Sequence, residues 1–337
     1  MDERGIVGDA QEEIIRGISS FALYGFPESH SASFALIAYA SAYLRAHYPA
    51  AFLVGMLNAY PLGFYNPATL VKDAQNHGVE VRPIDAAHSR VACSLETGKA
   101  APAVRLGLRY VHGLRREVGE QLVSERERGA FDSCADLLRR VPMQRAELDT
   151  LAELGALAGI EPALRARREA LWQVAALERD PNSLFAGAKP ETSPSPLEEM
   201  NAMDETLADY RTSGMTTGPH VMQHFRNALR RRGVLSTREL RDTPNGRWVA
   251  TAGHVIVRQR PGSAKGFCFV TLEDETGTAN GVLTPDQFQR FRTPLHTAKL
   301  LEIEGPVQNV DGVIHVRIRD LRPLAAEREL PGSHDYR

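Results

Sequence analysis

Residues 248–260, WVATAGHVIVRQR, and residues 265–275, KGFCFVTLEDE, decide how the last third of this chain folds. In both segments hydrophobic and polar residues tend to alternate, which is the two-residue period of a β-strand with one buried face. The same period continues in three further segments: GTANGVLT at 277–284, AKLLEIEGPVQNV at 298–310 and GVIHVRIRDL at 312–321.

The connections between these five strands specify their architecture. Asp311-Gly312 favours a tight hairpin between the last two strands. Residues 285–291, PDQFQRF, predict a short helix between the third and fourth strands. Five strands with one helix in that place are the arrangement of an OB-fold, a small β-barrel that often binds single-stranded nucleic acid. We therefore predict a five-stranded OB-fold at 246–325 and a tail at 326–337.

The first hairpin of the predicted barrel supplies candidate DNA contacts. Arg258, Arg260 and Lys265 lie around its turn, where positive charge attracts phosphates. Phe267 and Phe269 follow on the second strand and are candidates for stacking on bases. Strand alternation leaves an alternative open, in which both phenylalanines point into the barrel and belong to its core.

The amino-terminal residues 1–87 show a helical period instead. One helix is predicted from Asp9 and another at 67–77. Between them, a helix capped by Ser29 or Ser31 is apolar almost all round, so we expect it to be buried in the middle of an all-helical domain. Its uncharged apolar stretch is 13 residues long, shorter than the roughly 18 that a membrane span needs.

Residues 88–180 contain two glycine-bearing turns, at 113–114 and 155–156, that join predicted helices. This is the outline of a tandem helix-hairpin-helix, in which the helix start after each turn points backbone N–H groups at a phosphate. Plain helical hairpins use such turns too, so that alternative stays open. The candidate DNA contacts are Gly113, Leu114, Arg115, Arg116 and Gly155.

A segment with four prolines, residues 181–200, predicts a linker, and residues 201–245 predict a helical connector. The basic run at 230–232 is more typical of a solvated helix face than of a specific contact. Formal charge is −2, from 40 basic and 42 acidic residues, and therefore argues neither for nor against nucleic acid. The three cysteines lie far apart, without a CxxC pair, which predicts a reducing, cytoplasmic setting. The amino terminus has no apolar segment of the secretory kind.

The residue patterns of a complete enzyme are missing. No Asp-x-Asp pair, P-loop or GxSxG elbow occurs. Residues 273–275, Glu-Asp-Glu, form the densest acidic group but precede a glycine, which is typical of a turn. His220 and His224 share a helix face without a third ligand. We predict no catalytic residue and no metal ligand in this chain.

A longer segment adds a resemblance to this interpretation. Residues 24–85, YGFPESHSASFALIAYASAYLRAHYPAAFLVGMLNAYPLGFYNPATLVKDAQNHGVEVRPID, resemble the fingers of bacterial C-family DNA polymerases, and within them the error-prone paralogue of the polymerase III alpha subunit. The likeness spans nearly the whole chain. It continues through VRLGLRYVHGL at 104–114, DYRTSGM at 209–215 and VIVRQRPGSAKGFCFVTLEDETGTANGV at 255–282 and reaches GSHDYR at 332–337.

The resemblance implies helical fingers, hairpins that grip duplex DNA, and an OB-fold near the template strand. It also implies that a metal-binding PHP domain and a palm with catalytic Asp residues and Mg²⁺ precede the start of this sequence. In such polymerases the histidine matching His30, beside Ser29, lies close to the incoming nucleotide's phosphates. Without the resemblance, His30 reads as a helix cap. Replicative members often have Asn-Lys where this chain has Pro27-Glu28, so the surrounding contacts are expected to differ.

The expected partners are primer–template DNA, single-stranded template, the palm segment and companion proteins of a mutagenesis complex. NSLFAG at 182–187 occupies the place of a clamp-binding peptide but lacks its leading Gln, which argues against binding to the sliding clamp. We expect a DNA-holding part of an error-prone polymerase that does not polymerise alone. The alternatives are a stand-alone protein for single-stranded or junction DNA and an inactive truncated product.

Overall fold

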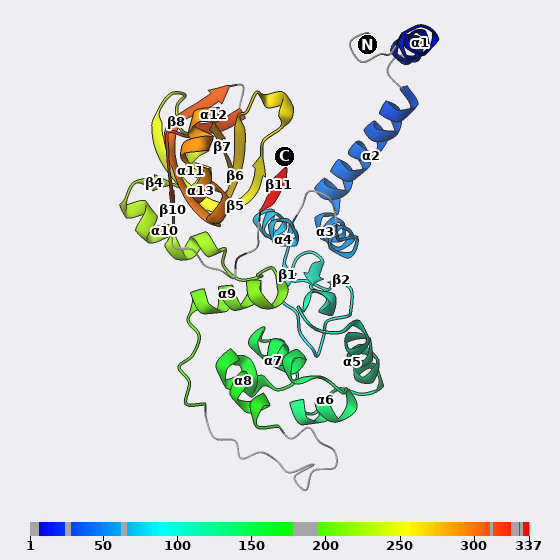
Figure 1. Ribbon diagram of the computed structural model, residues 1–337. Helices are drawn as coiled ribbons and strands as arrows, with labels where there is room; N and C mark the ends of the chain where they lie inside the picture. The colour runs from blue at the N-terminus through cyan, green and yellow to red at the C-terminus, as the bar shows by residue number, and fades with distance from the viewer. Residues whose placement is uncertain are drawn as a thin grey trace. The chain divides into compact units, whose positions relative to one another are not determined.

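A computed structural model gives the fold of the chain, which divides into two compact units, Met1–Phe52 and Leu53–Arg337. The first is helical, and the second contains helices followed by a β-barrel (Figure 1). The predicted α+β, multidomain fold class is therefore confirmed. The residues that the structure describes are 7–23, 28–61, 66–177, 195–310, 313–324, 330 and 333–336.

Helices α1 (Asp9–Leu23) and α2 (Glu28–His47) lie in the first unit. Because α2 begins at Glu28, positions 29 and 31 lie inside its first turn rather than at its cap. The predicted burial of α2 is not observed either: its large apolar residues Phe34, Leu36, Ile37 and Tyr39 are 58 to 70% exposed. A single helix cannot bury side chains that point in all directions, and no other described element of this unit covers them.

Two further helices follow, of which the second corresponds to the helix predicted at 67–77. Helix α3 (Pro49–Asn58) begins at a proline, whose fixed φ suits the first turn. Helix α4 (Pro67–Asn76) also begins at a proline, and the side chain of Asn66 caps it by accepting a 2.9 Å hydrogen bond from the Ala68 N–H.

Residues 78–177 combine a small sheet with short helices. The sheet has the order β1 (Val81–Arg82), β3 (Ala103–Arg105), β2 (Ser94–Glu96). Fully buried leucines join the helices into one core. The helical elements are η2 (Leu108–Tyr110), α5 (Arg116–Arg128), α6 (Cys134–Arg140), α7 (Arg145–Glu153), η3 (Pro162–Arg165) and α8 (Arg167–Ala175).

Residues 201–241 contain three helices and one short strand. Asn201 and Ser236 form capping boxes at the starts of α9 (Ala202–Ser213) and α11 (Thr237–Arg241). Between these two helices lie α10 (Val221–Arg231) and the short strand β4 (Val234–Leu235).

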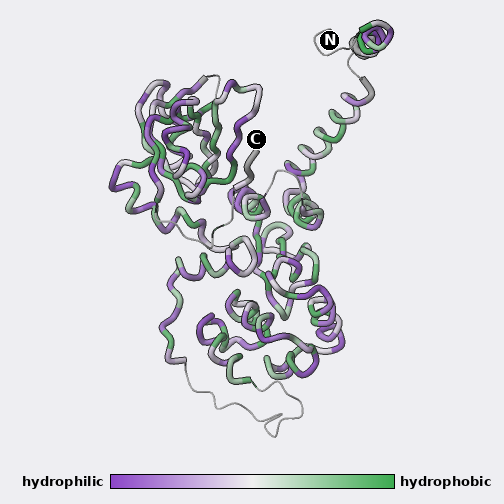
Figure 2. The backbone as a smooth tube through the Cα atoms, viewed as in Figure 1, coloured by the Kyte–Doolittle hydropathy of each residue, from purple (hydrophilic) through white to green (hydrophobic). Residues whose placement is uncertain are grey.

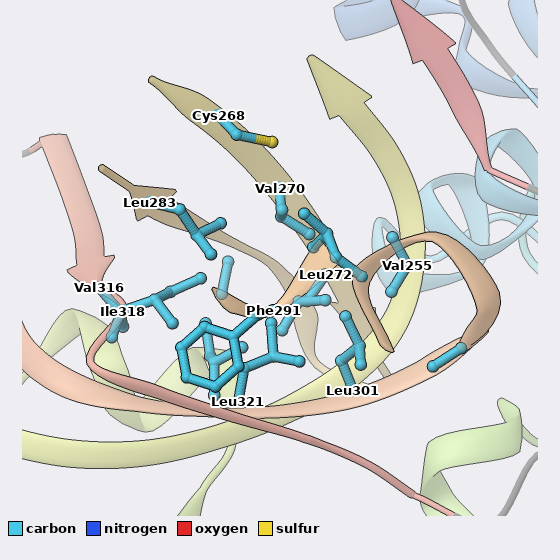
Figure 3. Packing of buried hydrophobic residues seen from close by; sticks show 14 of the residues in the cluster. Val255, Cys268, Val270, Leu272, Leu283, Phe291, Leu301, Val316, Ile318 and Leu321 are labelled. Atoms are coloured by element: carbon cyan, nitrogen blue, oxygen red, sulfur yellow. The ribbon is translucent and has the colours of Figure 1, made fainter. Parts of the chain in front are cut away.

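The five predicted strands form the predicted OB-fold. They run in the order β5-β6-β7-β9-β8, and β8 pairs back onto β5, which closes the barrel. The inward side chains, among them Val270, Leu272 and Leu301, form one core (Figure 3). The strands are β5 (Trp248–Gln259), β6 (Cys268–Asp274), β7 (Gly277–Leu283), β8 (Leu300–Val310) and β9 (Val313–Arg317), with η4 (Gly262–Ala264) after β5 and α12 (Pro285–Arg290) and α13 (Arg292–Thr297) before β8.

Two strands beyond the barrel extend its sheet. β10 (Asp320–Pro323) pairs with β8, and β11 (His334–Tyr336) pairs in parallel with residues 257–259 of β5. The segment predicted as a tail thus contributes a strand. Its three residues carry no alternating pattern long enough to reveal this from the sequence.

Candidate nucleic-acid interface

Strand β6 and the residue before it expose two aromatic side chains. Cys268, Val270 and Leu272 point inward and are buried, so Phe269 points outward. Phe267 directly precedes β6, and both phenylalanines are 38% exposed. The alternative that these phenylalanines form the core is therefore wrong, because the strand pleat assigns the core to the residues between them.

Neighbouring strands extend this exposed surface. Phe269 lies opposite Val282 of β7 and Gln259 of β5, and paired residues of neighbouring strands share a face of the sheet. We call the surface formed by Phe267, Phe269 and Val282 the aromatic face. Exposed phenyl rings on a flat sheet are a stacking surface for unpaired bases.

Two of the three predicted cations lie at the turn beside this surface. Lys265 is exposed and adopts a left-handed conformation with φ 49°. The guanidinium of Arg260, also exposed, lies 4.4 Å from the centre of the Phe288 ring on α12. Both charges can approach phosphates that pass the aromatic face.

Arg258 is not brought together with them. It pairs in register with Val270 and so lies on the opposite face of the sheet from Phe269. Its guanidinium donates a 2.7 Å hydrogen bond to the Ala298 carbonyl oxygen and another to the Ser333 hydroxyl. Its observed contacts hold the carboxy-terminal segment on the barrel.

The first hairpin turn has the geometry of a helix start after a glycine. Gly113 has φ 77°, where glycine is favoured, and Leu114 leads into α5. The element before the turn is only the single turn η2, not the helix that the sequence predicted. Arg116 is 82% exposed, with its Nε 2.8 Å from Glu120 Oε1. This pair is open to water and therefore weak, which leaves Arg116 able to reach a phosphate.

Arg115, by contrast, is engaged inside the protein. Its backbone N–H and its guanidinium donate hydrogen bonds of 2.8 to 2.9 Å to the carboxylate of Glu147 on α7, which is 1% exposed. Burial alone would raise the pKa of Glu147, but these bonds and one from the Gln144 N–H lower it to about 2. Arg115 therefore joins the two hairpins, a role that the sequence did not reveal.

The second turn is closed on the preceding helix. Gly155 also has φ 77°, but its N–H donates to the Ala152 carbonyl oxygen, and the Ala156 N–H donates to that of Leu151. This is a helix C-cap, and α8 begins only at Arg167. The N–H groups of Gly155 and Ala156 are therefore engaged within the hairpin and are not free.

The predicted nucleotide contacts lie in the first unit. His30 is exposed in the first turn of α2, and its ring centre lies 4.5 Å from that of Phe34. The side chain of Ser29 lies outside the residues that the structure describes, as do positions 184–185 of the clamp-like peptide. The interpretation of His30 as a helix cap does not hold, because the helix begins two residues earlier.

The acidic group at 273–275 is structural. Asp274 accepts hydrogen bonds from Thr276, as the turn prediction requires, and also from Thr237 and from Arg226 Nη2 at 2.8 Å. Glu273 Oε2 lies 3.7 Å from Nε2 of buried His220, whose other ring nitrogen caps α10. The described residues hold no group of three or more His, Cys, Asp or Glu suited to a metal.

A buried lysine, which the sequence did not reveal, adds to this polar region. Lys72 donates a 2.9 Å hydrogen bond to Gln75 Oε1 and another to the Gly218 carbonyl oxygen, and so ties α4 to the connector. Burial lowers its pKa to about 8. Among the described helices, none is both long and apolar enough to cross a membrane.

Two families of known domains match this chain. A helix-hairpin-helix motif matches residues 78–170, and an OB-fold nucleic acid binding domain matches residues 249–324. Among solved structures, asparaginyl-tRNA synthetase from Pyrococcus horikoshii overlaps 29% of this chain and 24% of its own, with a TM-score of 0.26 and 22% identity. That likeness is too distant to decide the fold.

Curated relatives match almost the entire chain. The error-prone DNA polymerase of Anaeromyxobacter dehalogenans strain 2CP-C is 46% identical over 333 residues, which cover 96% of this chain and 29% of the relative. Error-prone DNA polymerase 1 of Agrobacterium fabrum is 44% identical over 92% of this chain and 30% of the relative. The error-prone DNA polymerase of Pseudomonas aeruginosa PAO1 is 41% identical over 95% and 31%. The chain spans about 30% of the length of these relatives.

Proposed function

Because the chain is homologous to the carboxy-terminal part of error-prone DNA polymerases, we propose that it holds DNA for such an enzyme during damage-induced, translesion synthesis. The observation that carries this proposal is the aromatic face, where Phe267 and Phe269 are exposed beside Lys265. Neighbouring exposed phenyl rings add apolar surface that is in contact with water in a monomeric protein. Unpaired bases of DNA can cover these rings by stacking on them.

In this proposal the hairpin region binds duplex DNA and the barrel binds single-stranded DNA. Arg116 at the start of α5 suits the phosphates of duplex primer–template, with which it makes sequence-independent contacts. The barrel suits the unpaired template, since stacking contributes roughly 1–3 kcal/mol per base.

The proposal also includes a nucleotide site in the first unit. His30 and Ser29, at the amino-terminal end of α2, would contact the phosphates of the incoming nucleotide, as a helix amino terminus favours anions. The described residues do not fit a Mg²⁺ site. We therefore place the metal-binding carboxylates on a separate palm segment and assign no catalytic residue to this chain.

The exposed apolar side chains of α2 support a further polypeptide partner. Large apolar residues along a helix are normally covered, and those of α2 are exposed. We propose that the palm segment covers them. Companion proteins of a mutagenesis complex would bind elsewhere on the chain, and the sliding clamp is not among the proposed partners.

A stand-alone DNA-binding protein is the second candidate. The barrel and the hairpin region each bury their own leucines, and therefore do not depend on a palm for their cores. This candidate predicts full DNA affinity without any partner.

The first experiment measures DNA binding by the whole chain. Fluorescence anisotropy with a labelled single strand should show an affinity that falls with salt. Replacing both Phe267 and Phe269 by Ala should weaken binding by roughly 10- to 100-fold. Trp248→Ala is the matched control, because Trp248 is an exposed aromatic residue of the same barrel outside the aromatic face. Equal effects of the two changes would refute the aromatic face as the binding surface.

A second experiment tests the division of labour with a palm. We expect the purified chain not to extend a primer with Mg²⁺ and all four deoxynucleotides. Extension would show that the chain carries catalytic carboxylates of its own. Addition of a palm-containing segment that restores extension would favour the polymerase part over the stand-alone protein.

A further inference from the structure

A pocket of about 540 Å³ opens at one end of the barrel, where α11 meets β7 and β9. The pairing of β7 with β9 begins only at Asn280 and His315, so the two strands separate before that point. Leu240 of α11 fills the end of the barrel core beneath the opening. Pockets of this kind at the mouths of β-barrels are common ligand sites, and a volume of roughly 300–1,000 Å³ is typical.

Strand register connects this pocket to the aromatic face. Asn280 lies opposite Thr271 of β6, and two residues further along β7, Val282 lies opposite Phe269. Residues two apart on a strand share a face and are separated by about 7 Å. The edge of the pocket is therefore the next side-chain position after the aromatic face.

The edge of the pocket offers unused hydrogen-bonding groups. Asn280 accepts a 3.0 Å hydrogen bond from Thr271 Oγ1, and its amide N–H groups have no partner among the described residues. His315 Nε2 lies 3.0 Å from Gln308 Oε1. The Nδ1 atom of the same ring can donate or accept, depending on the tautomer. The amide N–H groups of Asn280 and this ring nitrogen thus stand on paired residues of β7 and β9.

The rest of the lining combines apolar side chains with the polar residues Thr237, Thr278 and Asn309 and one cation. Ala279 and Val316 are buried and form its inner wall together with Leu240. Arg241 at the end of α11 is exposed, and its guanidinium has no hydrogen bond or ion pair within the part of the chain that the structure describes. An apolar inner wall, a polar edge with donors and acceptors, and one positive charge match a base, with its apolar faces and polar edge, joined to a phosphate.

We propose that this pocket, the barrel-mouth pocket, binds one unstacked nucleobase of single-stranded DNA. The base edge lies against Asn280 and His315, and the phosphate of the same nucleotide lies near Arg241. This inference rests on the proposed function, because it continues the path of a strand that stacks on Phe267 and Phe269. The pocket then fixes the register of the strand on the barrel, whereas stacking alone permits sliding.

The test combines changes in the protein with changes in the DNA. The whole chain is titrated with labelled 12-nucleotide strands that each carry one abasic position, moved stepwise along the strand. For the unmodified protein we expect one position at which loss of the base weakens binding by roughly 10-fold. Asn280→Ala and Arg241→Ala should weaken binding of the intact strand and should remove that position-specific penalty. Arg241, Asn280 and His315 all line the pocket. Thermal melting checks that each variant is folded.

The control lies on the same helix. Arg238 is an exposed arginine of α11 outside the pocket, so Arg238→Ala removes the same charge from the same element. It should leave the position-specific penalty in place. Both changes weaken the general attraction to phosphates. Arg241→Ala must therefore weaken DNA binding more than Arg238→Ala does at the same salt concentration.

The outcomes separate the pocket from the proposed function. If Phe269→Ala weakens binding but Asn280→Ala and Arg241→Ala behave like Arg238→Ala, DNA uses the aromatic face and the pocket inference is wrong. If the unmodified protein binds no single strand, both the pocket and the proposed function are wrong. Loss of the position-specific penalty in Asn280→Ala and Arg241→Ala, with the penalty retained in Arg238→Ala, supports the pocket.

Discussion

Helix α2 and strand β6 both contain several large apolar residues (Figure 2), but those of α2 are mostly exposed, whereas Val270 and Leu272 of β6 are buried. In β6, Val270 and Leu272 are fully buried, while in α2, Leu36 and Tyr39 are mostly exposed. A strand in a closed barrel gains an inside and an outside from its own neighbours. A helix gains an inside only when another surface meets it. Apolar content alone therefore does not show whether a segment completes its own core.

The largest loss of stability is expected for a change in the core of the barrel. Leu272→Ala should destabilise the barrel by about 3 kcal/mol, because it leaves a cavity in a closed core. Since the chain has several domains, the measurement is hydrogen exchange of the amides of β5 to β8, followed by mass spectrometry. Unchanged exchange of these amides would mean that the barrel does not rely on this core.

The next effect concerns the buried charges between the connector and the barrel. Asp274→Ala removes hydrogen bonds from Thr237 and leaves Arg226 with Glu275 as its remaining acidic partner. We expect a loss of about 2–3 kcal/mol, because the buried donors of Thr237 and Arg226 Nη2 lose their common acceptor. Hydrogen exchange of α10 and α11 checks it. Asp286→Ala, an exposed carboxylate on α12, is the control and should change stability by less than about 0.5 kcal/mol.

A smaller effect depends on pH and involves the hairpin region. The pKa of Glu147 is about 2 in the folded chain, below its usual value of 4.5. A lowered carboxyl pKa stabilises the fold above pH 4.5, and this contribution is lost as the pH falls from 4.5 towards 2. Glu147→Gln should cost about 2 kcal/mol at pH 7 and almost nothing at pH 2. Urea denaturation of the hairpin region, monitored by Trp172 fluorescence at both pH values, measures the difference. An equal loss at pH 2 and pH 7 would contradict the ion pair.

The smallest change in stability is expected for an exposed apolar residue of α2. Leu36→Ala should change the thermal stability of the chain by less than about 0.5 kcal/mol, because the side chain is already exposed. Under the proposed function, the same change should weaken the association with a palm segment measurably in a pull-down titration. A large loss of stability in the chain alone would show that this side chain is covered within the chain.

The sequence predicted the barrel well because each of its strands carries a local two-residue period and its turns carry their own residues. It also placed Phe267 and Phe269 next to basic residues. It could not decide which way these rings point, because a shift of one residue exchanges the two faces of a strand. The register with β7 settles this point.

Contacts between distant segments were beyond prediction. Arg115 and Arg116 are neighbours with the same charge, yet only Arg115 meets a buried carboxylate, 32 residues away. Gly155 carries the residue signal of a hairpin turn, but the hydrogen bonds behind it end a helix. The sequence makes Arg258 a candidate DNA contact, but in the structure its guanidinium binds the hydroxyl of Ser333 in the carboxy-terminal segment. In each case the deciding partner lies outside the local pattern.

Strand β11 has a consequence for how the protein behaves in solution. β5 leaves β8 halfway along its length, and its last residues would present unpaired N–H and C=O groups at a sheet edge. Such edges recruit strands of other molecules and start aggregation. Because β11 occupies this edge at residues 257–259, the last few residues of the chain act as a guard against self-association. Removal of these residues should promote self-association of the barrel without destabilising its core.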